Sequence, residues 1–130
     1  MSLRVVRLGS ARHAEEGLRI GTVRRPPRGV PKERFAEDDW YDLWLPQLAP
    51  SAELVKRAQS ASSEAEWRAF ERKYRAEMTQ PDNGRLIALL AALSRRTNLS
   101  VGCYCDDESR CHRSVLADLL AAEGAEIEPG

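Results

Sequence analysis

A strand-like segment that passes within a few residues into a helix constrains the fold of this chain most. Residues 99–105, LSVGCYC, have the composition of a buried strand, and residues 109–124, SRCHRSVLADLLAAEG, carry apolar side chains at helical spacing. Ser109 is the predicted N-cap of this helix, and Gly124 is placed to end it. A strand followed closely by a helix is a building unit of α/β folds.

The rest of the chain adds strands at both ends and helices between them. Residues 3–11 and 18–23 alternate as strands do, and residues 125–127 resume a strand pattern. Besides the last helix, four are predicted: from Asp38 to the residue before Pro46, from Ser51, from Ser63 to Met78, and around residues 86–96. We therefore expect one α/β domain, residues 1–130, with a small, mostly parallel sheet flanked by about five helices.

Charge and apolar content limit the partners and the compartment. The 20 basic and 20 acidic residues cancel, so no overall field draws the protein to nucleic acid or to an acidic membrane. The N-terminus lacks a signal-peptide apolar run, and no stretch approaches the roughly 18 apolar residues of a membrane span. We expect a cytoplasmic protein with neither membrane nor nucleic-acid partners, and the sequence does not indicate its oligomeric state.

All three cysteines and one of the two histidines lie between residues 103 and 112. An odd number of cysteines without an export signal favours free thiols or metal ligands over disulfides. Together Cys103, Cys105, Cys111 and His112 form a candidate Cys₃His set for zinc or iron, although their spacing differs from the paired knuckles of structural zinc sites. The alternative for Cys103 and Cys105 is that they are small buried strand residues.

The start of the last helix is also a candidate site of thiol chemistry and of anion binding. Unpaired backbone N–H groups there would stabilise a thiolate of Cys111, so Cys111 and His112 are the candidate catalytic residues. Beside them, Arg113 and Ser114 are candidate ligands for an anion.

Residues 24–35, RRPPRGVPKERF, combine three prolines with five basic residues and are predicted to form a loop. If the strands are parallel, Arg24, Arg25 and Arg28 would lie on the same rim as the start of the last helix. Loop and helix would then form one cleft for a small phosphorylated or nucleotide-like ligand. The alternative is a solvated loop whose arginines pair with nearby acidic residues: Glu33, Glu37, Asp38 and Asp39.

Four segments in order, RRPPRGVPKERF, DDWYDLWLPQLAPSAEL, WRAFERKYRAEM and CHRSVLADLL, resemble the domain of unknown function 488 family, YeaO-like branch, over residues 18–122. The matching positions are Pro27, Arg28, Gly29, Lys32, Ala49, Pro50, Ser51, Phe70, Tyr74, Cys111, His112, Arg113 and Ser114. Pro26 stands where that branch has a tryptophan, so a stacking role does not carry over. The family has no settled activity, so the resemblance implies the fold more than the function.

Three functions stay open at this point. The first is binding or conversion of a small anionic ligand, with a Cys/His-based activity. The second is a Cys₃His metal or redox module, and the third is a non-catalytic accessory domain that binds a partner protein.

Overall fold

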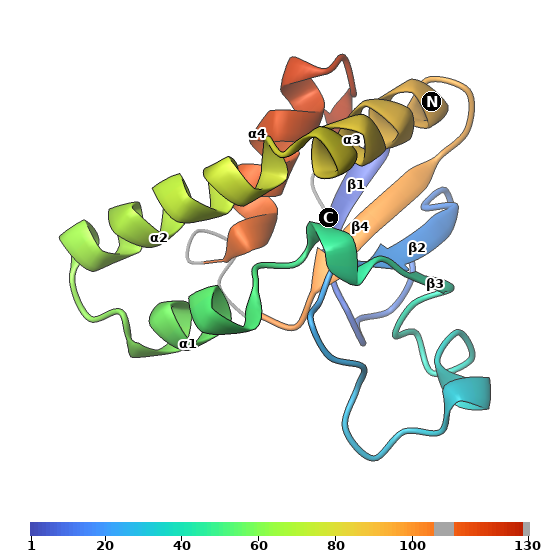
Figure 1. The fold of residues 1–130 in the computed structure, drawn as a ribbon. Helices are drawn as coiled ribbons and strands as arrows, with labels where there is room; N and C mark the ends of the chain where they lie inside the picture. The colour runs from blue at the N-terminus through green and yellow to red at the C-terminus, as the bar shows by residue number, and fades with distance from the viewer. Residues whose placement is uncertain (106–110, 129–130) are drawn as a thin grey trace.

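Five parallel strands form the sheet of the computed structural model, which describes residues 1–105 and 111–128. The strands are β1 (Leu3–Arg7), β2 (Leu18–Gly21), β3 (Leu43–Trp44), β4 (Leu99–Cys103) and β5 (Ile127–Glu128). Their order across the sheet is β3-β2-β4-β1-β5, and every pairing is parallel (Figure 1). The predicted α/β class with a small parallel sheet is therefore confirmed.

The α-helices of the described residues lie together on one side of this sheet (Figure 1). They are α1 (Ala52–Ser60), α2 (Glu64–Met78), α3 (Pro81–Ser94) and α4 (His112–Ala122). Two short 3₁₀ helices precede them, η1 (Lys32–Arg34) between β2 and β3 and η2 (Pro46–Leu48) between β3 and α1. Ser51 and Ser63 cap α1 and α2 as predicted, because their hydroxyl oxygens accept hydrogen bonds from the Leu54 and Glu66 amides. The helices bury their apolar faces against strand residues such as Val5, Ile20 and Val101.

The helix predicted from Asp38 is wrong. The structure has a turn at Asp39, whose φ is 63°, followed by β3, which pairs with β2. The Leu45 amide donates to the Gly21 carbonyl, and the Trp44 indole N–H donates to the Val23 carbonyl at 2.7 Å. These contacts with a distant segment replace the local hydrogen bonds of a helix, although the apolar spacing fits one.

The last helix is shorter than predicted at its start. Its first residue is His112, and the N-cap position belongs to Cys111. The predicted N-cap, Ser109, lies outside the described residues. Gly124 follows the helix with a φ of 101°, as expected of a glycine at a helix end.

The face of the sheet opposite the helices carries a buried ion pair. The Arg19 guanidinium contacts the Glu16 carboxylate at 2.6 Å, and neither side chain is more than 2% exposed. Arg19 also donates to the carbonyls of Ser10 and Asp39, and the Ser100 hydroxyl donates to Glu16 at 2.7 Å. These contacts fasten the segments after β1 and before β3 to the sheet.

The carboxyl ends of parallel strands meet at one edge, and this edge positions the candidate site. β4 ends at Cys103, β2 leads into Thr22 and the basic loop, and α4 begins at the same edge. In open α/β sheets ligands collect at this edge. Along residues 1–105 and 111–128, no helix has the length and apolar character needed to cross a membrane.

Candidate metal centre

Cys103, Cys111 and His112 converge at the carboxyl edge of the sheet. Cys103 is the last residue of β4, Cys111 is the N-cap of α4, and His112 is its first residue. All three are buried, and their ligand atoms lie within 4.8 Å of one another. The strand end and the helix start therefore bring two sulfur atoms and an imidazole nitrogen to one point.

A backbone contact fixes the tautomer of His112. Its Nε2 atom lies 2.7 Å from the Thr22 carbonyl oxygen, which can only accept a hydrogen bond, so Nε2 carries the proton. Nδ1 then has a free lone pair, and it lies 3.7 Å from the Cys111 sulfur. Burial lowers the pKa of His112 to about 4, which keeps the ring neutral.

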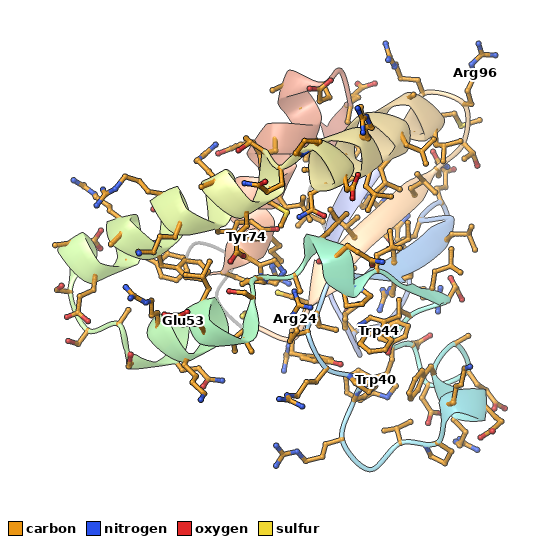
Figure 2. The ribbon with its side chains drawn as sticks, in the orientation of Figure 1. Arg24, Trp40, Trp44, Glu53, Tyr74 and Arg96 are labelled. Atoms are coloured by element: carbon orange, nitrogen blue, oxygen red, sulfur yellow. The ribbon has the colours of Figure 1, made fainter. Side chains whose placement is uncertain are left out.

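Tyr74 holds the other side of the imidazole. Its ring meets His112 edge to face at a centroid distance of 5.4 Å, and its hydroxyl donates to the Leu48 carbonyl at 2.7 Å. Figure 2 shows Tyr74 directed from α2 toward the segment that precedes α1. The histidine is thus fixed by one hydrogen bond and by one aromatic contact.

Cys105 lies at the exposed side of the cluster. Its side chain is exposed, unlike the buried Cys103 and Cys111. The influence of both thiols on the pKa of Cys105 indicates that it lies near them. Of the four predicted ligands, the structure brings Cys103, Cys111 and His112 into one tight group, and Cys105 is not part of that group.

The three thiols favour one thiolate between them. Interactions with Cys103 and then Cys111, together with the positive charge of Arg113, lower the pKa of Cys105. The hydrogen bond with Cys105 raises the pKa of Cys103 to about 12, and hydrogen bonds with Cys103 and Cys105 raise that of Cys111. These shifts point to Cys105 as the thiol that ionises first, and a thiolate on Cys111 at the helix start stays a prediction.

The observed spacing fits a tetrahedral ion. Zinc bonds of about 2.3 Å to sulfur and about 2.0 Å to nitrogen place neighbouring S and N ligands about 3.5 Å apart. The 3.7 Å from Cys111 Sγ to His112 Nδ1 is close to this value. The site can receive a metal ion with little movement of these two side chains.

Arg113 and Ser114, the predicted anion ligands of α4, are engaged with the backbone. Arg113 is 5% exposed, and its Nη1 donates to the Val6 carbonyl at 2.9 Å, while its Nε has no hydrogen-bond partner among the described residues. The Ser114 hydroxyl donates to the Cys111 carbonyl at 2.9 Å.

Among the described residues, Arg24 of the basic loop and Arg113 of α4 line different pockets. Arg24 donates to the carbonyls of Ala49 and Pro50 and lines a pocket of about 330 Å³, whereas Arg113 lines a different one of about 260 Å³. Arg25 and Arg28 are exposed, and the Arg25 carbonyl accepts a hydrogen bond from Tyr104. The ligand-binding role of these arginines stays a prediction.

Sequence reasoning missed two groups at this site. The Thr22 carbonyl is a backbone atom, so no residue type signals it in advance. Tyr74 is predicted only as part of an apolar helix face, although a tyrosine in such a face needs a partner for its hydroxyl, and that need is a usable signal.

One family model covers nearly the whole chain: DUF488-N3a, described as the active DUF488-N3 subclade, matches residues 3–124. No curated protein and no solved structure matches.

Proposed function

The chain belongs to the domain of unknown function 488 (DUF488) family, and on this fold we propose that it is a metal-binding protein that holds one zinc ion at the carboxyl edge of its sheet. Cys103, Cys111 and His112 supply two sulfurs and Nδ1, and Cys105 supplies the fourth ligand from the exposed side. The set is the predicted Cys₃His site.

One observation carries this proposal: the hydrogen bond from His112 Nε2 to the Thr22 carbonyl. Histidine ligands of metals generally donate their second ring N–H to a carbonyl or carboxylate, which orients the ring and fixes the coordinating nitrogen. In this structure the remaining nitrogen faces the sulfur of Cys111. A histidine with only a packing role has no need to present its lone pair to a thiol.

The donor set favours zinc among divalent ions. Thiolate and imidazole ligands in tetrahedral arrangement suit zinc, and an iron ion with the same ligands is the alternative. Three thiolates and a neutral histidine around Zn²⁺ carry a net charge of −1, which the buried guanidinium of Arg113 offsets. The ion would tie the end of β4 to the start of α4.

The test is the metal content of protein purified without oxygen or chelator. We expect about one zinc ion per chain by plasma mass spectrometry, and less than about a tenth of that in Cys103→Ser. Tyr104→Phe is the matched control, because Tyr104 adjoins the cysteines but contacts Arg25 and Trp40 instead. Equal metal content in Cys103→Ser and the wild type contradicts the proposal.

A further inference from the structure

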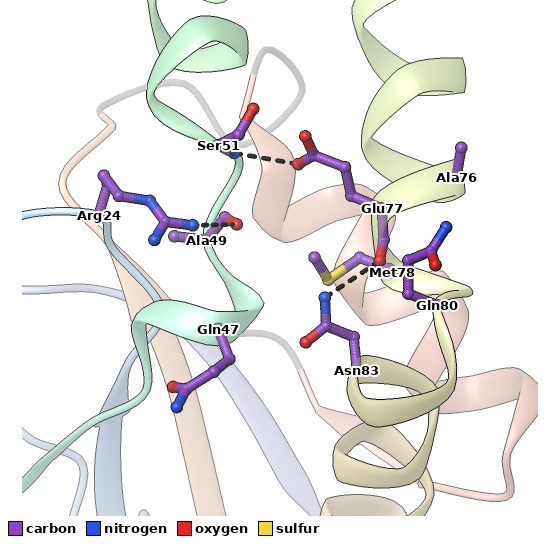
Figure 3. Close-up of a pocket in the computed structure, with 9 residues that line it drawn as sticks. All are labelled: Arg24, Gln47, Ala49, Ser51, Ala76, Glu77, Met78, Gln80 and Asn83. Atoms are coloured by element: carbon purple, nitrogen blue, oxygen red, sulfur yellow. Dashed lines mark hydrogen bonds between the residues drawn. The ribbon is translucent and has the colours of Figure 1, made fainter.

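A second site lies where Arg24 meets the ends of three helices. The pocket of about 330 Å³ is an open depression bordered by the corner between η2 and α1, the end of α2 and the start of α3 (Figure 3). Its volume falls in the range of small-molecule sites. None of the proposed metal ligands lines it.

Two opposite charges are held on one corner of this pocket. Arg24 donates hydrogen bonds from Nε and Nη2 to the carbonyls of Pro50 and Ala49. Glu77 accepts a hydrogen bond at Oε1 from the backbone amide of Ser51 at 3.0 Å. Within the described part of the chain, Nη1 of Arg24 and Oε2 of Glu77 make no hydrogen bond, and the two side chains form no ion pair. Each therefore keeps one charged atom for another partner.

Three amide side chains line the same pocket. Asn83 donates from Nδ2 to the Glu77 carbonyl at 3.0 Å, so its Oδ1 remains an acceptor. Among the described contacts, the amides of Gln47 and Gln80 have no hydrogen-bond partner. Met78 and Ala49 add apolar surface. The pocket thus offers one cation, one anion and several neutral hydrogen-bonding groups.

This lining disfavours phosphorylated ligands. A phosphate group would meet the Glu77 carboxylate beside a single arginine, and like charges repel strongly in a partly buried site. Nucleobases are usually held by stacking on aromatic rings, and none of the described lining residues is aromatic. A ligand of balanced charge fits better.

We propose that this pocket binds a small zwitterion of the α-amino-acid type. The ligand carboxylate contacts Arg24 Nη1, its ammonium group contacts Glu77 Oε2, and its side chain lies among the amides. The two protein charges are fixed on adjacent residues of one corner, which suits a ligand whose ammonium and carboxylate groups are attached to the same carbon. The site is independent of the metal centre.

The experiment uses the full chain and the 20 common L-amino acids, each at about 10 mM. This concentration is about 100 times a weak dissociation constant, so a weakly bound amino acid still stabilises the folded protein. Thermal unfolding selects binders, and calorimetry then measures affinity. We expect at least one amino acid to raise Tm by about 2 °C or more. The corresponding amine, the corresponding carboxylic acid and inorganic phosphate should each have little effect.

Three variants show where binding takes place. Glu77→Gln keeps an acceptor for the Ser51 amide and removes the charge, so we expect a loss of affinity of about tenfold or more. Arg24→Gln should lose at least as much, whereas Arg28→Gln, in the same loop but outside the pocket, should bind as the wild type does. If no amino acid binds, if phosphate alone binds equally well, or if Glu77→Gln retains full affinity, the proposal is wrong.

Discussion

His112 donates a hydrogen bond from Nε2 to the Thr22 carbonyl at 2.7 Å, and this contact decides which ring nitrogen faces the thiols. We predict that nitrogen-15 NMR at pH 7 shows a neutral ring protonated at Nε2, with or without metal. Bound Zn²⁺ should shift the signal of Nδ1 and leave Nε2 protonated. A ring protonated at Nδ1 in the metal-free protein contradicts the assignment.

Cys105 should be the thiol that reacts first in metal-free protein. It is exposed, whereas Cys103 and Cys111 are buried, so an alkylating reagent reaches it without unfolding. Peptide mass spectrometry after brief iodoacetamide treatment should find the label on Cys105. Added zinc should slow that labelling, because Cys105 would be a ligand, and labelling that zinc leaves unchanged argues against its role as the fourth one.

Glu16→Gln should destabilise the fold by about 3–5 kcal/mol, because it leaves the buried Arg19 guanidinium without its counter-charge. Urea unfolding at pH 7 measures the loss. Glu53→Gln is the control, since its contact with Arg57 is exposed and should be worth less than about 1 kcal/mol.

The contribution of Glu16 should also depend on pH. Burial raises its pKa, but hydrogen bonds from Arg19, Ser100 and the His13 amide outweigh burial and lower it from 4.5 to about 2. A lowered folded-state pKa gives stability that is complete above the unfolded value and is lost as pH falls through the folded one. The stability difference between wild type and Glu16→Gln should therefore shrink by about 3 kcal/mol between pH 5 and pH 2. A difference that does not change with pH contradicts this account.

Tyr74→Phe should cost about 1–3 kcal/mol, because the buried Leu48 carbonyl loses its donor while the ring remains. Zinc content should not change, since the phenyl ring still packs on His112. Urea unfolding and metal analysis of the same preparation test both statements, and loss of zinc would mean that the hydroxyl also positions the site.

The sequence predicts the part of the site that is local. A strand with Cys103, a short connection and a helix with Cys111 and His112 in its first turn follow from alternation and helical spacing, and these two elements bring the ligands together. The apolar spacing around Trp40 and Trp44 misleads, because β3 pairs with β2 instead of forming a helix. Helix propensity and the spacing of apolar residues do not indicate which distant strand will pair with a segment and take up its backbone hydrogen bonds.

The relation between the two arginine sites depends on strand order, which the sequence alone does not fix, because several parallel arrangements satisfy the same pattern. In the sheet, β4 lies between β2, which precedes Arg24, and β1, which Arg113 contacts. Arg24 and Arg113 line different pockets, although His112 at the start of α4 contacts Thr22 just after β2.

Titration of the metal-free, reduced protein with Co²⁺ tests the metal centre most directly. Tetrahedral Co²⁺ with thiolate ligands absorbs strongly in the visible and near ultraviolet, whereas six-coordinate Co²⁺ absorbs weakly. We predict that these bands grow to an end point of one Co²⁺ per chain, disappear when Zn²⁺ is added, and are absent from Cys111→Ser. A weak spectrum of the six-coordinate type, with no end point at one equivalent, contradicts the proposal.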